Sequence, residues 1–367
     1  MVATDGSSVI GFRTLLTLSG ETAVDPAPRR GARLALRTLG AVSTPSAAPQ
    51  SSDPLAALAE LPGVADAVAD ARRAVDRLYG HRIMRRRAAE VTSESALRGA
   101  RASAALDGAD WPLEEVRRRT DFGTDPEARI IGGALRLNAE AGQLLGTWRH
   151  SPLQVLARLH LLASGDSGTE SAGGEGSGRG DGGAGSAGRP RAAGEAVAER
   201  FGAVLPVAEE VGGFDATGVP SFELPPPPGA DEVAARLDGL ARMIIARGAG
   251  GPGRKHPNER VAPALVVAAV VHGELLTLQP FTAHNGLVAR AAQRIVLIAE
   301  GMDPQAICPI EVGLAELGTD AYRNALGGYA SGTAEGMAGW IAHCGGALRL
   351  GVRESTAVCE AMQRGMV

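Results

Sequence analysis

Two strongly apolar segments, residues 258–278 and 286–300, flank one short loop and constrain the fold more than any other feature. Each segment is long enough for several helical turns and too apolar for a surface helix. Only 3% of the residues are aromatic, so the remaining core must be built from Ala, Leu and Val. Ala and Leu favour helices, whereas strands favour aromatic and β-branched residues. The sequence therefore predicts a mainly α fold.

Composition and periodicity divide the chain into five segments. They are a flexible N-terminal segment (1–50), an N-terminal helical region (51–163), a Gly/Ser-rich low-complexity insert (164–195), a core (196–355) and a C-terminal tail (356–367). In the helical region and the core we expect helices over residues 55–61, 64–89, 93–106, 112–116, 126–145, 152–163, 231–246, 258–278, 286–300, 318–329 and 335–349. Gly80 can break or bend the second of these helices. Short alternating pieces punctuated by glycine over residues 196–224 predict a small β-hairpin.

The bulk properties restrict the classes of partner. A formal charge of −4 gives no electrostatic case for nucleic acid. No apolar stretch approaches the roughly twenty residues that span a bilayer, and no signal peptide is recognisable. Cys308, Cys344 and Cys359 show no metal-ligand or CxxC spacing, so we expect free buried thiols and no metal site. We therefore expect a cytoplasmic protein with no membrane and no nucleic-acid partner.

The loop between the apolar segments reads Gln279-Pro280-Phe281-Thr282-Ala283-His284-Asn285-Gly286-Leu287. A helix that starts at Asn285-Gly286 presents free backbone N–H groups and the positive end of its dipole, and glycine lets an anion approach closely. By itself, this pattern is equally that of an ordinary turn between two helices.

The wider stretch resembles the signature of the Fic (Fido) family of protein adenylyltransferases, His-Pro-Phe-x-Asp/Glu-Gly-Asn-Gly-Arg-x-x-Arg. Pro280, Phe281, Asn285, Gly286 and Arg290 fall at matching positions. The resemblance covers roughly residues 95–355 and is interrupted by the insert. It implies a Fic-like helical bundle with a small β-hairpin flap and an N-terminal helical extension.

The chain departs from this signature where the family does its chemistry. Gln279 stands at the position of the general base and cannot take up a proton at working pH. Ala283 replaces the acid that holds Mg²⁺ on the phosphates, and Leu287 replaces the first arginine, a phosphate clamp. His284 occupies the family's first glycine, where its side chain is expected to fill the phosphate space or distort the loop. A role for His284 as a relocated base competes with that of an ordinary loop histidine.

A second segment resembles the family's inhibitory helix, which carries Ser/Thr-x-x-x-Glu-Gly/Asn. Ser103, Asp107 and Gly108 match it, with Asp in place of Glu. In the family the acid pairs with the second arginine of the signature, which here is Arg290. Asp107-Gly108 is also a common ending for a helix, so a regulatory motif and a C-terminal turn both remain as interpretations.

The leading hypothesis is a degenerate Fic-like pseudoenzyme that acts as a binding or regulatory module for an unknown protein partner. Residual nucleotide or anion contact would fall on Asn285, Gly286 and Arg290. The alternative is an active nucleotidyl- or phosphotransferase that uses ATP and Mg²⁺ with an altered mechanism on a protein hydroxyl. A third class is a purely structural, partner-binding bundle.

Overall fold

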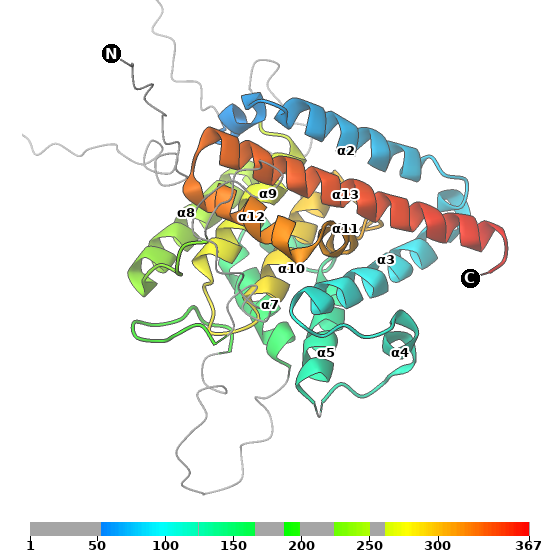
Figure 1. The fold of residues 1–367 in the computed structure, drawn as a ribbon, viewed down its shortest axis with the longest axis horizontal. Coiled ribbons are helices and arrows are strands. Elements are labelled where there is room, and N and C mark those ends of the chain that lie inside the picture. The colour runs from blue at the N-terminus through cyan, green and yellow to red at the C-terminus, as the bar shows by residue number, and fades with distance from the viewer. Residues whose placement is uncertain (1–52, 124, 166–186, 199–223, 250–260, 367) are drawn as a thin grey trace, which may run out of the picture.

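The computed structural model describes residues 53–123, 125–165, 187–198, 224–249 and 261–366. Every regular element within these ranges is a helix, and no strand occurs in them (Figure 1). The prediction of a mainly α fold is confirmed. The predicted flap hairpin falls largely on residues 199–223, which lie outside the described residues, as do the N-terminal segment and residues 166–186 of the insert.

In the first half, the described residues form η1 (Ala56–Glu60), α2 (Val64–Tyr79), α3 (Met84–Leu106), α4 (Leu113–Arg118), α5 (Pro126–Glu140), α6 (Leu145–Trp148) and α7 (Pro152–Ser164). In the second half they form α8 (Ala230–Ala249), α9 (Ala264–Leu278), α10 (Asn285–Ala299), α11 (Ile310–Leu317), α12 (Thr319–Ser331) and α13 (Ala334–Gln363).

Some boundaries differ from the prediction. The helix expected over residues 64–89 ends at Tyr79, because the chain turns at Gly80 and restarts as α3 at Met84. The helix expected over residues 93–106 is the second part of α3. The prediction missed α11, whose apolar period is interrupted by Glu311 and Gly313. The expected C-terminal tail is helical as far as Gln363, because α13 continues well past residue 349.

The core is centred on α9 and α10, which pack against each other. All residues of α9 from Leu265 and all residues of α10 up to Ile298 are buried. The long helix α13 crosses the molecule, with α2 along one side and α11 and α12 along the other (Figure 1). The helix α3 packs against α5, α10 and α11. Among the described residues, no helix combines the length and apolarity needed to span a bilayer.

A glycine contact fixes the position of α11. A Cβ atom at Gly313 would lie 1.9 Å from the carbonyl oxygen of Ala347 in α13, far inside van der Waals contact. The two helices approach this closely only because residue 313 has no side chain. Because α11 also packs against α3, this contact helps to place α3 beside the loop between α9 and α10.

Candidate functional site: the loop between α9 and α10

The loop begins and ends at residues with left-handed backbone conformation. Gln279 follows α9 with φ +43°, and its amide still bonds to the Leu275 carbonyl oxygen at 3.0 Å. His284 precedes α10 with φ +60°. Neither residue is glycine, so each conformation is uncommon and must be held by its surroundings.

The side chain of Asn285 closes the loop on itself. Its Oδ1 accepts a hydrogen bond from the Phe281 amide at 2.9 Å, and its Nδ2 donates to the Phe281 carbonyl at 2.8 Å. The Phe281 ring is buried and stacks on His160 of α7, with centroids 4.2 Å apart. Asn285 therefore bonds the loop backbone with both ends of its amide.

The carboxylate of Asp107 lies over the start of α10. A Cβ atom at Gly286 would lie 2.5 Å from Asp107 Oδ1, so a side chain at this position would force the carboxylate to shift. Arg290 Nη2 pairs with the same oxygen at 2.7 Å, and the guanidinium also bonds Ser103 Oγ at 2.8 Å and the Ser103 carbonyl at 2.9 Å. A carboxylate of the chain itself thus lies at the N-terminal end of α10, the end of a helix that favours negative charge.

Asp107 is placed by the C-terminal turn of α3. Gly108 has φ +95°, its amide bonds the Ala105 carbonyl at 3.1 Å, and the Ala109 amide bonds the Ala104 carbonyl at 3.0 Å. These two bonds are those of a Schellman ending. The interpretation of Asp107-Gly108 as a helix ending agrees with this geometry, and the same turn brings the carboxylate to Arg290.

A second arginine of α10, which the sequence interpretation overlooked, holds α3 in the same way. Arg294 is 2% exposed, pairs with Glu311 of α11 at 3.1 Å and donates to Ser95 Oγ at 2.9 Å. It also donates to the Ala306 carbonyl at 2.9 Å. The available signal was its position four residues after Arg290, which puts two cations on one face of an apolar helix.

Arg290 lies beside two buried side chains, those of His272 and Tyr322. Tyr322 Oη and His272 Nε2 are 2.6 Å apart. Burial, Arg290 and His343 hold the pKa of His272 well below its ordinary value, and burial raises the pKa of Tyr322. Burial opposes the charge on Arg290, but attraction by Asp107 and Tyr322 outweighs it and raises the pKa of the guanidinium. Arg290 is therefore the charged group of this network.

Solved structures of Fic proteins resemble this fold. A Fic family protein from Desulfovibrio desulfuricans G20 superposes with a TM-score of 0.52 at 19% identity, covering 81% of this chain and 75% of that chain. Fic-1 from C. elegans superposes with a TM-score of 0.50 at 14% identity, covering 82% of this chain and 75% of that chain. The chain has the Fic fold. No family model matches the sequence, and neither does any curated protein.

The residues that replace the chemical positions of the Fic signature are largely withdrawn from the surface. Gln279 is 2% exposed and Leu287 is 1% exposed, the latter as part of the hydrophobic core. Ala283 is half-buried in the loop. Together these positions offer an amide, a methyl group and an isobutyl group, none of which takes up a proton at working pH or binds a hard cation through a carboxylate.

The expectation that His284 fills the phosphate space or distorts the loop stays a prediction, and a second obstacle at Gly286 comes from α3. The atoms nearest to a Cβ built on Gly286 belong to Asp107 and Arg290. His284 is half-buried, and its ring centroid lies 6.4 Å from that of His160. Burial and the proximity of His284 lower the pKa of His160 to about 4, so this neighbour is neutral near pH 7.

Residues 187–198 cover the loop, although residues 187–195 were expected to belong to an unpacked insert. The Arg191 amide bonds the Pro280 carbonyl at 2.7 Å, and the Ala198 amide bonds the Thr282 carbonyl at 2.7 Å. The Gly188 amide donates to His160 Nδ1 at 2.9 Å. Low-complexity composition predicted a flexible segment, whereas these hydrogen bonds hold it against the backbone of the loop.

The side chain of Arg191 secures the same segment. Its Nε donates to the Gln279 carbonyl at 2.9 Å, and its Nη2 lies within hydrogen-bonding distance of the carbonyls of Leu278 and Pro228. It thereby supplies donors to the C-terminal carbonyls of α9, where a positive charge also complements the helix dipole. Burial lowers the pKa of this guanidinium. Arg191 had no recognisable sequence signal, since it follows a glycine-rich run.

Proposed function

We propose that this chain is a Fic-fold pseudoenzyme that serves as a binding or regulatory module for another protein. One observation carries the proposal: the carboxylate of Asp107 lies over Gly286 and pairs with Arg290 at 2.7 Å. An incoming phosphate would have to displace this carboxylate, because two anions repel each other strongly in a buried site.

The loop chemistry supports the same conclusion. A positioned general base contributes about 10²–10⁴ to a rate, and Gln279 cannot act as one. Loss of a charge-stabilising donor costs about 10²–10³, and Leu287 has replaced such a donor. Losses within one site are not additive, but no described residue in the loop replaces both functions.

The residues do not fit Mg²⁺–ATP, the cofactor that the Fic resemblance implies. Ala283 offers no side-chain oxygen to a metal that prefers hard oxygen ligands. Within the described residues, no group of three or more His, Cys, Asp or Glu side chains is arranged to hold a metal ion. Asn285, which the resemblance makes a nucleotide contact, has both polar ends of its side chain bonded to Phe281.

We further propose a reducing, cytoplasmic setting. Cys308, Cys344 and Cys359 are free and buried, as in proteins that are kept reduced. Burial raises the pKa of Cys308, as does nearby Asp303, and burial raises that of Cys344. These thiols are thus unreactive packing groups rather than nucleophiles.

The alternative, an active transferase with an altered mechanism, rests on His284. This histidine is the one titratable side chain within the loop itself, residues 279–284. A relocated base of this kind would have to reach a target hydroxyl from its place beside His160.

Both hypotheses are tested by incubating the protein with α-labelled ATP, Mg²⁺ or Mn²⁺ and cell lysate. We expect no label on any protein. Label transfer that disappears in the variants His284→Ala or Arg290→Ala would overturn the proposal and support the alternative.

A variant with the Fic signature restored serves as the positive control in the same labelling experiment. It reinstates the signature and removes the blocking carboxylate through Gln279→His, Ala283→Asp, His284→Gly, Leu287→Arg and Asp107→Gly. Leu287 is a core position, so retention of the fold is first checked by circular dichroism. A folded variant is expected to gain nucleotide-dependent labelling that the parent chain lacks. Equal labelling by both proteins would contradict the assignment of the loss to these positions.

A further inference from the structure

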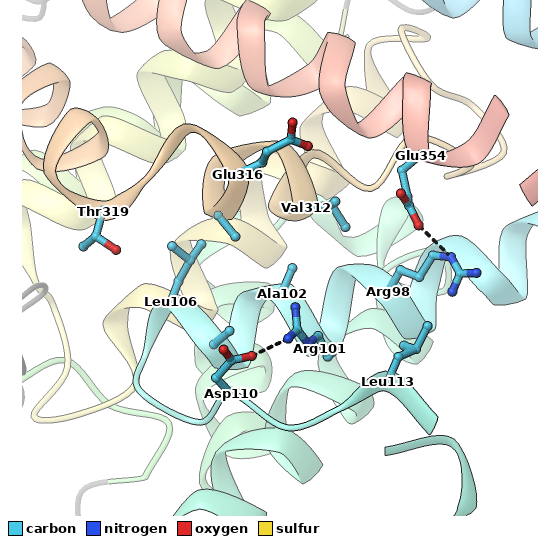
Figure 2. A pocket seen from close by; sticks show the side chains of 12 residues that line it. Arg98, Arg101, Ala102, Leu106, Asp110, Leu113, Val312, Glu316, Thr319 and Glu354 are labelled. Atoms are coloured by element: carbon cyan, nitrogen blue, oxygen red, sulfur yellow. Dashed lines mark hydrogen bonds and ion pairs between the residues drawn. The ribbon is translucent and has the colours of Figure 1, made fainter. Parts of the chain in front are cut away.

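Most arginines in the described part of the chain have a partner within it. At the pocket between α3 and α11, Arg98 pairs with Glu354 and Arg101 pairs with Asp110 (Figure 2). Arginines of α2, α8 and α13 also pair with carboxylates. Charges paired in this way are balanced inside the chain, so they need no anion from outside.

The turn between α2 and α3 is the exception. Arg77, Arg82, Arg85 and Arg86 are all exposed, and their guanidinium groups have no hydrogen-bond or ion-pair partner among the described residues. Elsewhere in the described ranges, arginines without a partner occur only singly. We call these four residues the arginine patch. It presents several uncompensated positive charges within ten residues of chain.

Local structure accounts for one residue of the patch and not for the other three. Arg77 lies in the last turn of α2, where a cation complements the helix dipole. Arg85 and Arg86 lie in the first turn of α3, the end of a helix that disfavours cations, and no acidic residue lies in that turn. The Arg85 amide bonds the Arg82 carbonyl at 3.3 Å, which puts like charges one turn apart. These charges destabilise the chain on its own, and an uncompensated break of a local rule is typical of a functional site.

The neighbouring Arg87 shows what an arginine with a structural role does at this position. Its Nε donates to Glu90 Oε1 at 2.8 Å, and its Nη1 donates to the Met362 carbonyl at 3.3 Å. Arg87 thereby joins α3 to the C-terminal end of α13, where a positive charge is favourable. Arg85 and Arg86 make no such contact within the described residues. The packing of this corner therefore uses Arg87 and leaves the patch free.

Carboxylates on three helices border the patch and limit the size of its ligand. The C-terminal ends of α2 and α13 meet the start of α3 at one end of the molecule (Figure 1). Asp70 and Asp76 lie on α2, Glu90 lies on α3 and Glu360 lies on α13. A nucleic-acid duplex or a charged membrane surface would extend over these carboxylates, which repel it. A short anionic segment can pair with the arginines and avoid the acids.

We propose that the arginine patch docks a short acidic segment of a partner protein, about four consecutive Asp or Glu residues long. Arginine suits this task because its planar group can bind a carboxylate with two parallel hydrogen bonds. That the partner is a protein rests on the proposed function. The patch lies at the first turn of α3 and Asp107 follows the last, so roughly 30 Å of helix separates docking from the loop between α9 and α10.

The binding test is a titration of the full chain, labelled with ¹⁵N-arginine, with a peptide of four consecutive glutamates flanked by Gly and Ser. The arginine Nε–H resonances are recorded by NMR in about 50 mM NaCl, because surface ion pairs weaken with salt. We expect saturable shifts of the patch resonances with a Kd of about 1 mM or tighter. No saturation up to about 10 mM peptide, or equal shifts with free glutamate at the same carboxylate concentration, would overturn the proposal.

Two triple variants locate the binding. The patch variant carries Arg82→Gln, Arg85→Gln and Arg86→Gln, and it should bind the peptide at least tenfold more weakly. The control variant removes the same number of charges from exposed arginines on three other helices: Arg158→Gln, Arg242→Gln and Arg353→Gln. The control should bind like the parent. Equal weakening in both variants would show a general attraction of charge and refute the patch.

Thermal unfolding separates docking from a structural role of the same arginines. Because Arg82, Arg85 and Arg86 have no partner in the described chain, the patch variant should melt at the Tm of the parent or above it. A Tm several degrees lower would show that these arginines stabilise the fold, and the argument for an external partner would fail.

Two further titrations decide the class of partner, one with a twenty-nucleotide single strand and one with vesicles that contain phosphatidylserine. We expect both to bind more weakly than the peptide. Tighter binding of either, lost in the patch variant but not in the control, would overturn the assignment to a protein segment. A failed peptide titration refutes the patch and leaves the labelling experiment with ATP unaffected, whereas transfer of label refutes the proposed function without altering the peptide result.

Discussion

Replacement of Asp107 by alanine is the most informative single perturbation of this protein. Arg290 is fully buried, and the Asp107 side chain is only 13% exposed. The variant therefore leaves a buried guanidinium without its one carboxylate, although Ser103 still accepts two of its hydrogen bonds.

Removing one partner of a buried ion pair costs about 3–5 kcal/mol. The remaining bonds to Ser103 put the expected loss of unfolding free energy at the low end, about 3 kcal/mol. For a chain of this size the corresponding fall in Tm is about 4–6 °C. Asp110→Ala is the control, because Asp110 is 67% exposed and also pairs with an arginine. Its loss should cost at most about 1 kcal/mol.

The assay measures whether an added anion stabilises Asp107→Ala by taking the place of the missing carboxylate. Without the carboxylate, Gly286 and Arg290 offer a helix N-terminus and a buried cation to sulfate or phosphate. At a hundred times its Kd, sulfate should restore about 2.7 kcal/mol to Asp107→Ala. Sulfate also stabilises proteins in general, so the relevant quantity is the excess of the Tm shift over that of the wild type. A variant that keeps the wild-type Tm, or gains no excess shift, would refute the role assigned to Asp107.

Three further outcomes are expected. In urea denaturation, Gly313→Ala should lower the free energy of unfolding by about 3 kcal/mol, because it forces two helices apart. Gly346→Ala should be neutral or stabilising, because the atom nearest to the new Cβ would lie at 3.8 Å. Equal effects of the two variants would contradict the packing. Arg191→Ala should lower stability by about 2 kcal/mol and speed amide hydrogen exchange over residues 278–282, and unchanged exchange there would show that Arg191 does not secure the loop. Burial lowers the pKa of His343 to about 4, so between pH 6.5 and 4 the unfolded chain binds a proton that the folded chain does not, and stability falls as the pH falls. His343→Gln should reduce the slope of the urea midpoint against pH in that window, with His160 and His272 contributing the remainder, and an unaltered slope would contradict this assignment.

Local sequence predicts an element well when its apolar periodicity agrees with the glycine and proline residues that mark its ends. The apolar segments 258–278 and 286–300 became α9 and α10, and Pro126 and Pro152 correctly marked the starts of α5 and α7. A glycine within a continuous period leaves the helix boundary open. Gly80 can break or bend the helix expected over residues 64–89, and in the structure α2 ends at Tyr79 and α3 begins at Met84.

The sequence predicted only those site residues that lie within a motif resembling the Fic family. The resemblance to the Fic signature singled out Arg290 and Asp107, which the structure brings together. Arg294 and Arg191 depend on distant partners, Ser95 and Gln279, and no local pattern encodes such pairs. The same limit applies to the carboxylate of Asp107 over Gly286, because the sequence neighbours of Gly286 do not encode a contact from α3.

Equilibrium titration of ATP with and without Mg²⁺, into the wild type and into Asp107→Ala, tests most directly whether Asp107 closes the anion site. The wild type should show no saturable binding. The variant should bind ATP with an affinity independent of Mg²⁺, because Ala283 supplies no ligand for the metal. Saturable, Mg²⁺-dependent binding of ATP by the wild type would contradict the account.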